Sequence, residues 1–473
     1  MPELSDTAMG RARNIHFVGI GGAGMCGIAE ILHNLGYKIS GSDLKTSSVT
    51  AHLEGLGIPV RIGHESNNVD GSDVVIVSSA VSTDNPEVQT ARSQRIPVIP
   101  RAEMLAEIMR FRHGIAIAGT HGKTTTTSLI ASILAEAGMD PTYIIGGLLN
   151  SINTNARLGS GKYLVAEADE SDASFLHLQP VFAVLTNIDA DHLGTYEDSF
   201  NRLSNTFVEF LQRLPFYGFA VLCLEDSATR KIIPSLSKPY FTYGFGDDAD
   251  YIASDISINE HRSYFSVIRP DNKSILEINL NLPGRHNILN SLAAIAIASE
   301  LDVPDQPIIN ALKEFQGIAR RCNVLGDIEI DGKLMTIIDD YAHHPNELKE
   351  TLKAVREGWP GRDLLVVFQP HRFTRTRDLF KEFCDVLSSQ NQLILLDVYP
   401  AGEAPIPGAD TTALCSALVS DGNKNIKHVK DVDGVIPVIA DSIFDNGIIL
   451  ILGAGDIATL GPALVEKFGK TVH

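Results

Sequence analysis

Cysteine is scarce in this sequence, with five residues among 473 and no CxxC pair. A disulfide framework typically has an even number of cysteines, and a cysteine-based zinc site has CxxC-type pairs, so the pattern argues against both. An odd, scattered set fits a reducing compartment. The five are Cys26, Cys223, Cys322, Cys384 and Cys415.

Positive charge is also in deficit. The chain has 39 Lys and Arg against 58 Asp and Glu, which gives a formal net charge of −19. This balance opposes nonspecific binding to nucleic acid or to an anionic membrane, because neutralising phosphates requires a surplus of basic side chains. The sequence therefore predicts no nucleic-acid partner.

Long apolar runs are missing as well. No run approaches the roughly eighteen apolar residues of a membrane-spanning helix, and residues 1–14 lack the apolar core and cleavage site of a signal peptide. We therefore expect a cytoplasmic protein without membrane insertion. Its 44% hydrophobic residues supply several cores, and at roughly 150 residues per domain the length predicts about three domains.

Strand-like apolar runs alternate with helical patterns along nearly the whole chain, which indicates α/β layers built on parallel sheets. We expect a Rossmann-like N-terminal domain over residues 1–110 and a P-loop ATPase-like central domain over residues 111–319. A second Rossmann-like domain should follow over residues 320–473. Within the central domain, residues 251–282 show short alternating strands, which predict an extra antiparallel patch beside the main sheet.

A glycine-rich turn follows the first apolar strand, residues 15–18. Gly19-Ile-Gly-Gly-Ala-Gly24 fits GxGxxG between a strand and a helix, and Asp43 lies about twenty residues further on. Such glycines let the backbone approach a diphosphate, the helix N-terminus supplies amide donors, and the acid accepts from ribose hydroxyls. The pattern does not choose among NAD, FAD and a UDP-sugar, and a tight turn without a ligand is the remaining alternative.

A second phosphate-type loop, Gly119-Thr-His-Gly-Lys-Thr124, again joins a strand to a helix. In P-loops the amides and the lysine hold the β- and γ-phosphates while the hydroxyl binds Mg²⁺. The longer form of that pattern requires glycine at position 117, where this chain has Ile117. The loop therefore predicts a nucleoside triphosphate site in a shortened form.

Carboxylates gather after the next two strand-like runs of the central domain. Each alone would be a solvated loop residue, but as a set beside a GKT loop they predict one or two hard cations that bridge phosphate oxygens. They are Glu167, Asp169, Glu170 and Asp172 after the first strand, and Asp189, Asp191 and the imidazole of His192 after the second.

Polar groups also follow two strands of the third domain. The stretch from Asp339 to Pro345 and the stretch from Gln369 to Arg375 should project at the carboxyl edge of a sheet, where α/β folds bind ligands. Arg372 and Arg375 there suit a carboxylate clamp, although ordinary surface arginines would give the same pattern. The polar residues 284–290 at a helix start fit a base contact or a simple helix cap equally well.

Seven stretches together resemble motifs of the Mur ligases of bacterial cell-wall synthesis, and the match runs through all three domains. They are GxGGxGM at residue 19, GTHGKTTT at 119, EADESD at 167, TNxDxDH at 186, GxHNxxN at 284, DDYxHHP at 339 and QPHRxTRT at 369. Two departures, Ala319 and Ala342 where the family more often has glycine, are conservative. The resemblance favours UDP over NAD at the first turn.

The resemblance implies an ATP-dependent amide ligase whose three domains bind a UDP-substrate, ATP and an amino acid in turn. The substrates would be UDP-N-acetylmuramate and L-alanine, with Mg²⁺ as the metal and Mn²⁺ as an alternative. The partners would be small molecules, and the protein a monomer or homodimer. The muramate carboxylate would first be activated as an acyl phosphate, because a carboxylate is a poor electrophile.

Site residues follow from the same resemblance. The nucleotide site would comprise Gly119, Thr120, His121, Gly122, Lys123, Thr124, Thr125, Asn287, Asn290, Arg321 and Asp339. The metal ligands would be Thr124, Glu167 and His192. The UDP-substrate site would comprise Gly21, Gly22, Ala23, Gly24, Ser42, Asp43, Ser78 and Ser79. The amino-acid site would comprise Tyr341, His343, His371, Arg372 and Arg375. The catalytic residues would be Lys123, His192, His343, Arg372 and Arg375.

Several rival functions share parts of this pattern. A related ligase could attach a recycled peptide to the same UDP-sugar or add amino acids to folate, but the arginine pair and the UDP-type first domain favour a single amino acid. A nicotinamide-dependent oxidoreductase or a noncatalytic nucleotide-binding regulator would belong to a different class. The set of metal ligands disfavours both.

Overall fold

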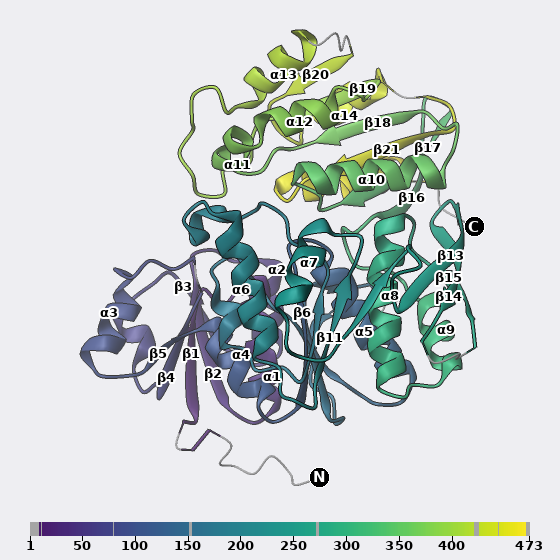
Figure 1. Ribbon diagram of the computed structural model, residues 1–473. Coiled ribbons are helices and arrows are strands. Elements are labelled where there is room, and N and C mark those ends of the chain that lie inside the picture. The colour runs from purple at the N-terminus through teal and green to yellow at the C-terminus, as the bar shows by residue number, and fades with distance from the viewer. Residues whose placement is uncertain are drawn as a thin grey trace. The chain divides into compact units, whose positions relative to one another are not determined.

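The computed structural model describes residues 9–10, 12–78, 80–150, 154–270, 274–420, 425–442 and 444–469. Strands and helices alternate along these residues, and the strands form three sheets (Figure 1). The α/β class expected from the sequence is confirmed. Within the described parts of the chain, no helix has the length and apolar character needed to cross a membrane.

The first sheet has five parallel strands in the order β3-β2-β1-β4-β5. Because the strands are parallel, the turns after them lie along one edge of the sheet, and that edge carries the first glycine-rich turn. The strands are β1 (Asn14–Val18), β2 (Lys38–Asp43), β3 (Val60–Ile62), β4 (Val74–Val77) and β5 (Val98–Pro100). The helices are α1 (Ala23–Asn34), α2 (Ser48–Gly55), η1 (Ser66–Val69), α3 (Pro86–Ser93) and α4 (Arg101–Met109).

The second sheet has ten strands in the order β15-β14-β13-β12-β11-β10-β6-β9-β7-β8. The region expected as a patch beside this sheet extends it instead, and β13 joins β12 in parallel. The strands are β6 (His113–Ala118), β7 (Thr142–Leu149), β8 (Thr154–Arg157), β9 (Tyr163–Glu167), β10 (Phe182–Leu185), β11 (Phe219–Cys223), β12 (Tyr240–Gly244), β13 (Tyr251–Asn259), β14 (Arg262–Ile268) and β15 (Leu276–Leu280). The helices are α5 (Lys123–Glu136), η2 (Ser174–His177), η3 (Leu193–Tyr196), α6 (Phe200–Gln212), α7 (Ser227–Ile232), η4 (Ile233–Ser235), α8 (Arg285–Glu300) and α9 (Asp305–Lys313).

The third sheet has six strands in the order β16-β17-β21-β18-β19-β20, all parallel except β16. One apolar cluster joins it to α10, α12 and α13, and another to α14 and α15, which makes it doubly wound as expected. The strands are β16 (Asn323–Ile330), β17 (Lys333–Asp340), β18 (Leu364–Phe368), β19 (Gln392–Leu396), β20 (Ile426–Val429) and β21 (Gly447–Leu452). The helices are α10 (Pro345–Gly358), α11 (Phe373–Asp378), α12 (Phe380–Leu387), α13 (Thr411–Ser420), α14 (Val435–Ala440), η5 (Asp456–Thr459) and α15 (Leu460–Phe468).

The chain separates into two compact units. The first comprises Met1–Asp255, Phe265–Ile278 and Leu289–Gln316, and the second comprises Ile256–Tyr264, Asn279–Ile288 and Gly317–His473.

The first unit contains the first sheet together with most of the second. The two sheets are held together by α1, which packs directly against β7 and β8. A Cβ added to Gly27 of α1 would lie 3.0 Å from the Cβ of Ala156 and 3.3 Å from a methyl of Ile144. One apolar core therefore serves both sheets. The expected domain boundaries after residues 110 and 319 stay predictions.

Candidate active site

The first glycine-rich turn is fastened to the end of β2. The amides of Gly19 and Ile20 donate to the Ser42 carbonyl at 2.9 and 3.0 Å. The amide of Gly21 donates to Asp43 Oδ2 at 2.9 Å, and a Cβ on Gly21 would lie 2.8 Å from that oxygen. Glycine is required at this position because the carboxylate approaches the backbone so closely.

Helix α1 begins directly after this turn. Gly22 is the N-cap and makes no side-chain capping bond, and the amides of Met25 and Cys26 donate to its carbonyl, so the amides of Ala23 and Gly24 are the ones that face an incoming anion. Ser78 follows β4 at the same edge and is half-buried. Ser79, also expected in the UDP-substrate site, lies outside the described residues.

A buried carboxylate supports the turn from beneath. Glu87 of α3 is fully buried and accepts hydrogen bonds from Ser42 Oγ at 2.7 Å and Asn68 Nδ2 at 2.7 Å, and it lies 3.0 Å from His16 Nε2. Burial alone would raise the pKa of Glu87, but the bonds from His16, Asn68 and Ser42 outweigh burial and lower the pKa to about 2. The hydroxyl of Ser42 is therefore engaged inside the domain, and its expected contact with a UDP-substrate stays a prediction.

The sequence patterns missed one cation at this edge. Arg101 is the first residue of α4, directly after β5, and its Nη2 lies 3.2 Å from Asp169 Oδ2. A Cβ built on Gly24 would lie 2.2 Å from Arg101 Nη1, which places the guanidinium against the first turn of α1. Its position as the first residue after a strand of a parallel sheet was the signal available in the sequence.

The second glycine loop is closely packed by its neighbours. Gly119 and Gly122 have φ values of +124° and +82°, and a Cβ on Gly119 would lie 2.1 Å from Thr186 Oγ1. A Cβ on Gly122 would lie 2.5 Å from Asn290 Oδ1, and the same oxygen accepts from Thr126 Oγ1 at 3.3 Å. Both glycines are needed for their backbone angle and for space. The structure thus places Asn290 at the base of the loop, and its expected contact with adenine stays a prediction.

Lys123 lies within a ring of carboxylates. Its Nζ is 2.8 Å from Glu170 Oε2 and also donates to two carbonyls of its own loop. Burial lowers the pKa of the ammonium, but Glu170, Asp169 and Glu167 outweigh burial and raise the pKa above its usual value. The predicted grouping of these acids around the loop lysine is therefore present in the structure.

The donors beside Lys123 fit a divalent hard cation. Three carboxylates face one ammonium, which leaves the ring anionic, and carboxylate and hydroxyl oxygens are the ligands that Mg²⁺ prefers. Thr124 and Thr125 follow Lys123 in the first turn of α5 and are buried, and Glu167 Oε1 accepts from the Gly146 amide at 2.6 Å. Among the described residues, Glu167 forms no hydrogen bond or ion pair with Thr124 or His192. That metal set stays a prediction.

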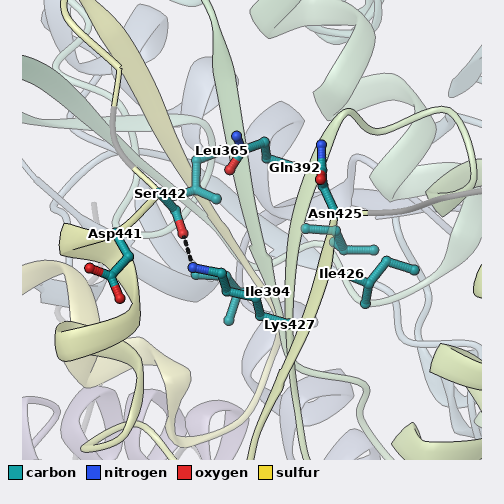
Figure 2. A pocket seen from close by; sticks show the side chains of 9 residues that line it. Leu365, Gln392, Ile394, Asn425, Ile426, Lys427, Asp441 and Ser442 are labelled. Atoms are coloured by element: carbon teal, nitrogen blue, oxygen red, sulfur yellow. Dashed lines mark hydrogen bonds between the residues drawn. The ribbon is translucent and has the colours of Figure 1, made fainter.

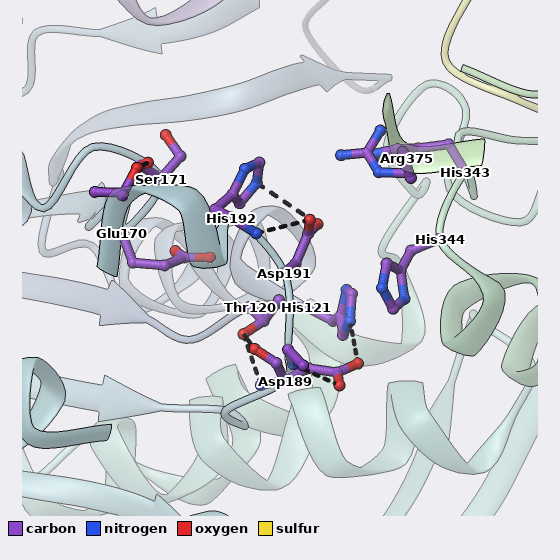
Figure 3. A network of polar contacts seen from close by, with 12 residues as sticks. Thr120, His121, Glu170, Ser171, Asp189, Asp191, His192, His343, His344 and Arg375 are labelled. Carbon is purple, nitrogen blue, oxygen red and sulfur yellow. Dashed lines mark hydrogen bonds and ion pairs between the residues drawn. The ribbon is translucent and has the colours of Figure 1, made fainter. Parts of the chain in front are cut away.

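The end of β10 holds the same loop from the other side. Asn187 Oδ1 accepts from the His121 amide at 2.9 Å, and Thr120 Oγ1 accepts from the Asp189 amide at 2.9 Å. The Asp189 carboxylate lies 2.9 Å from His121 Nε2, as Figure 3 shows. The conformation of Thr120 and His121 is therefore set by side chains about 66 residues away along the chain.

His192 lies in a short turn of unusual backbone conformation. It has φ of +54°, is the N-cap of η3, and lies with its Nε2 3.6 Å from Asp191 Oδ2 (Figure 3). Its side chain is partly exposed, so an incoming ligand can reach it. Asn287, by contrast, is buried at the start of α8, where its Nδ2 donates to the Pro283 carbonyl at 2.8 Å. Its local role is that of a helix-start residue, and its adenine contact stays a prediction.

In the second unit, two aspartates end β17. Asp339 is buried, its Oδ2 is 3.3 Å from Arg320 Nε, and burial raises the pKa of Asp339 against the opposing charge of that arginine. Its Oδ1 has no partner among the described residues, which leaves an acceptor for a ligand hydroxyl. Burial raises the pKa of Asp340 to about 6, although Arg321 and two backbone amides oppose the shift.

Four rings form a row at this edge of the third sheet. The ring centroids of Tyr341 and His343 are 5.2 Å apart, those of His343 and His371 are 5.8 Å apart, and His371 stacks on Tyr399 at 5.5 Å. Arg321 lies 5.2 Å from the Tyr341 ring. Sequence patterns missed Tyr399, which follows β19 at the same edge.

The histidines of this row are uncharged at neutral pH. Burial lowers the pKa of His343 to about 4, and burial together with His343 and neighbouring arginines lowers the pKa of His371 to about 4. His343 Nδ1 faces the Tyr341 carbonyl at 3.0 Å. Because a carbonyl only accepts, Nδ1 carries the proton and Nε2 is left as the proton acceptor.

The two expected clamp arginines lie beside these rings. Arg375 Nη1 is 3.5 Å from His371 Nδ1. Arg372 has φ of +73°, a strained value for a residue with a Cβ, and its Nη1 is 3.7 Å from Glu403 Oε1. Glu403 also accepts from the amide and hydroxyl of Thr374 at 3.0 and 2.7 Å, so it fixes the loop that carries Arg372. No sequence pattern pointed to Glu403.

A pocket at the opposite edge of the third sheet contains none of the expected site residues. It has a volume of about 300 Å³ and lies at the amino ends of β18, β19 and β20, where Lys427 Nζ donates to Ser442 Oγ at 2.8 Å (Figure 2). Parallel sheets bind ligands at their carboxyl edge, so this pocket lies apart from the candidate site.

Comparisons with known proteins cover most of the chain. The family model described as Mur ligase family, catalytic domain, matches residues 14–113. The Mur ligase middle domain matches residues 117–298, and the Mur ligase, glutamate ligase domain matches residues 320–455. These three segments carry, in order, the first glycine turn, the lysine loop and the row of rings.

Solved structures of this family resemble the chain. The UDP-N-acetylmuramate-alanine ligase of Thermotoga maritima is 31% identical with a TM-score of 0.81, covering 96% of this chain and 98% of that one. A murein peptide ligase from Psychrobacter arcticus is 24% identical with a TM-score of 0.72, covering 98% and 100%. The UDP-N-acetylmuramate:L-alanyl-γ-D-glutamyl-meso-diaminopimelate ligase of Neisseria meningitides is 28% identical with a TM-score of 0.60, covering 65% and 100%. The chain belongs to the Mur ligase family of ATP-dependent amide ligases.

Proposed function

We propose that this protein joins L-alanine to the carboxylate of UDP-N-acetylmuramate with ATP as the activating substrate. The products are UDP-N-acetylmuramoyl-L-alanine, ADP and phosphate, which makes the reaction a step of peptidoglycan precursor synthesis in the cytoplasm. The observation that carries this proposal is the 31% identity, over nearly the full length of both chains, to a UDP-N-acetylmuramate-alanine ligase. The geometry supports it because each sheet supplies one ligand edge, and so one place for each of three substrates.

Activation begins at the lysine loop. The muramate carboxylate resists attack because resonance and its negative charge make the carbon a poor electrophile. Attack of a carboxylate oxygen on the γ-phosphorus of ATP releases ADP and forms an acyl phosphate. Lys123 offsets the charge of the two anionic reactants as they approach each other. Thr124, Glu167 and His192 would hold Mg²⁺, which screens phosphate charge when bound.

Amide formation then takes place beside the row of rings. Arg372 and Arg375 bind the carboxylate of alanine through charge-assisted hydrogen bonds and keep it away from the reacting carbon. The amine must lose its proton before it attacks the acyl carbon and expels phosphate. We assign that proton to Nε2 of His343, which is uncharged at neutral pH and has its other nitrogen bonded to a carbonyl.

A second candidate is a ligase that attaches a peptide to the same UDP-sugar. The similarity to murein peptide ligases favours it. Both activities need the first turn and the lysine loop, so the difference lies in what the rings and arginines accept. Direct competition between L-alanine and a tripeptide for a limiting amount of UDP-N-acetylmuramate separates the two. Preferential formation of the tripeptide product would assign the second function.

The decisive test is phosphate release from Mg·ATP by the purified protein, with UDP-N-acetylmuramate and L-alanine added singly and together. Release that requires both substrates, with an equal amount of amide product, is the expected result. Trapping the acyl phosphate, or positional isotope exchange in ATP, tests the intermediate. Absence of phosphate release, together with binding or turnover of NAD(P)H, would mean that the first turn binds a nicotinamide cofactor.

A further inference from the structure

Arg101 is a cation at the ligand edge of the first sheet to which no sequence motif assigned a role. The glycine-rich turn over residues 19–24 contains no lysine or arginine. Arg101 approaches it from the start of α4, and its Nη1 lies where a Cβ on Gly24 would be, at 2.2 Å. The guanidinium therefore rests against the glycine backbone in the first turn of α1, and a larger residue at position 24 would displace it.

The surroundings of this guanidinium suit an anion with several oxygens. The N-terminus of α1 has no side-chain cap, so its amide donors and the positive end of the helix dipole lie beside Arg101. The planar guanidinium offers five donors in a geometry that matches phosphate oxygens. Arg101 and the α1 amides together form a larger and more positive anion site than the glycine turn alone.

The present partner of Arg101 is weakly bound. Asp169 lies 3.2 Å from Nη2, and its side chain is 41% exposed, so the ion pair is screened by water and contributes little. Asp169 also precedes Glu170, the acid that pairs with Lys123. One acidic loop thus holds both cations, Arg101 at the first turn and Lys123 at the lysine loop.

We propose that Arg101 binds the diphosphate of the UDP-substrate together with the amides at the N-terminus of α1, and exchanges Asp169 for phosphate oxygens when it does so. This inference rests on the proposed function, because it requires a UDP-linked substrate at the first turn. Arg101 is then a substrate-binding residue supplied by the start of α4, and it gives the turn the positive charge that its own sequence lacks.

The test compares the affinity of the full-length protein for UDP and for UMP by titration calorimetry, because the two probes differ only in the second phosphate. We expect Arg101→Gln to weaken UDP binding about 10- to 100-fold and to shrink the ratio of UDP to UMP affinity. Arg101→Lys should recover part of the loss. The matched control is Arg110→Gln at the C-cap of the same helix, which removes an exposed pair with Glu107 and should leave both affinities unchanged.

Further probes separate binding from a structural role. Binding of Mg·ADP reports on the lysine loop and should change less than about threefold in Arg101→Gln. UDP-N-acetylglucosamine, which has the diphosphate but no lactyl carboxylate, should lose as much affinity as UDP-N-acetylmuramate. Equal losses for UMP, UDP and Mg·ADP would overturn the assignment, and so would a loss confined to the carboxylate-bearing substrate.

The outcomes also distinguish this inference from the proposed function. If the wild-type protein binds neither UDP nor UDP-N-acetylmuramate, the proposed function itself fails. If the wild-type protein binds both and Arg101→Gln and Arg101→Lys bind them equally well, only the role of Arg101 is refuted. Thermal unfolding of each variant identifies any loss of binding that comes from a failure to fold.

Discussion

The two glycine-rich loops share a plan and differ in the source of their positive charge. Both join a parallel strand to the N-terminus of a helix. The loop at residues 119–124 carries its own cation, Lys123, at the first position of α5, whereas the turn at residues 19–24 is faced by Arg101 from the start of α4. A local sequence pattern can therefore predict the backbone shape of both loops, but it contains the cation of only the second.

The two loops also differ in what supports them. The first rests on a buried carboxylate, since Glu87 binds the Ser42 hydroxyl and the Ser42 carbonyl accepts two amides of the turn. The second is held by the side chains of Thr186 and Asn187 and by two ion pairs, His121 with Asp189 and Lys123 with Glu170. The first loop therefore depends on one buried acid, whereas the second is held by several separate groups. Four tests show how far this contrast extends.

The largest effect is expected from Lys123→Ala. Loss of the ammonium removes charge stabilisation from the transferred phosphate, so kcat should fall by about 1,000-fold or more. UDP binding, measured by calorimetry, should be unchanged because that loop has a separate cation. Lys231→Ala, an exposed lysine on α7, is the control. Full turnover by Lys123→Ala would instead revive the oxidoreductase alternative.

Glu87→Gln should destabilise the protein in a pH-dependent manner. The folded pKa of about 2 lies below the usual 4.5, so the ionised acid contributes stability that is complete above about pH 4.5 and is lost as the pH falls towards 2. The variant should unfold more easily by about 3 kcal/mol at pH 7. Urea denaturation from pH 7 to pH 3 should show this difference shrinking. A difference that is constant with pH would mean that packing, not charge, is responsible.

A matched pair of glycine substitutions, one in each loop, should differ by a smaller amount in the free energy of unfolding. Gly122→Ala combines a φ of +82° with a clash against Asn290, and should lower the free energy of unfolding by about 1–3 kcal/mol. Gly22→Ala has φ of −65° and no atom closer than 3.5 Å to the new Cβ, so it should cost under about 1 kcal/mol. Equal losses in urea denaturation would remove the distinction between the loops.

The smallest effect is expected from Asp169→Asn. The variant releases Arg101 from an exposed ion pair, which typically contributes about 0–1 kcal/mol, so UDP should bind up to about fivefold more tightly. Calorimetry with UDP measures the change. Weaker binding would show that Asp169 helps to hold Arg101 in place for the ligand and does not compete with it.

Much of the fold followed from local sequence because its signals are local. Apolar strands such as residues 115–118, the glycines of both loops and the helix that starts after Gly122 depend on neighbouring residues, and the structure has them where the sequence predicts them. The grouping of acids around Lys123 was also predictable, because successive parallel strands end at one edge of a sheet.

The contacts made by the missed residues depend on strand order, which no local pattern contains. Arg101 reaches Gly24 only because β5 and β1 belong to one sheet, separated by a single strand. Tyr399 meets His371 because β19 lies next to β18. Glu87 is an ordinary acid in its own helix, and its burial under the first turn follows from the packing of α3. Tertiary structure, rather than motif spacing, identifies such residues.

The contact of Gly27 with Ala156 and Ile144 determines where this enzyme can be recombined with its relatives. A hybrid joined near residue 111 would combine an α1 and a β7–β8 pair that have not evolved together, and any larger side chain at position 27 would push the two sheets apart. A junction at Gly317 keeps that seam intact. An exchange that starts at Gly317 should also carry residues 256–264 and 279–288, because they belong to the same compact unit as the C-terminal segment.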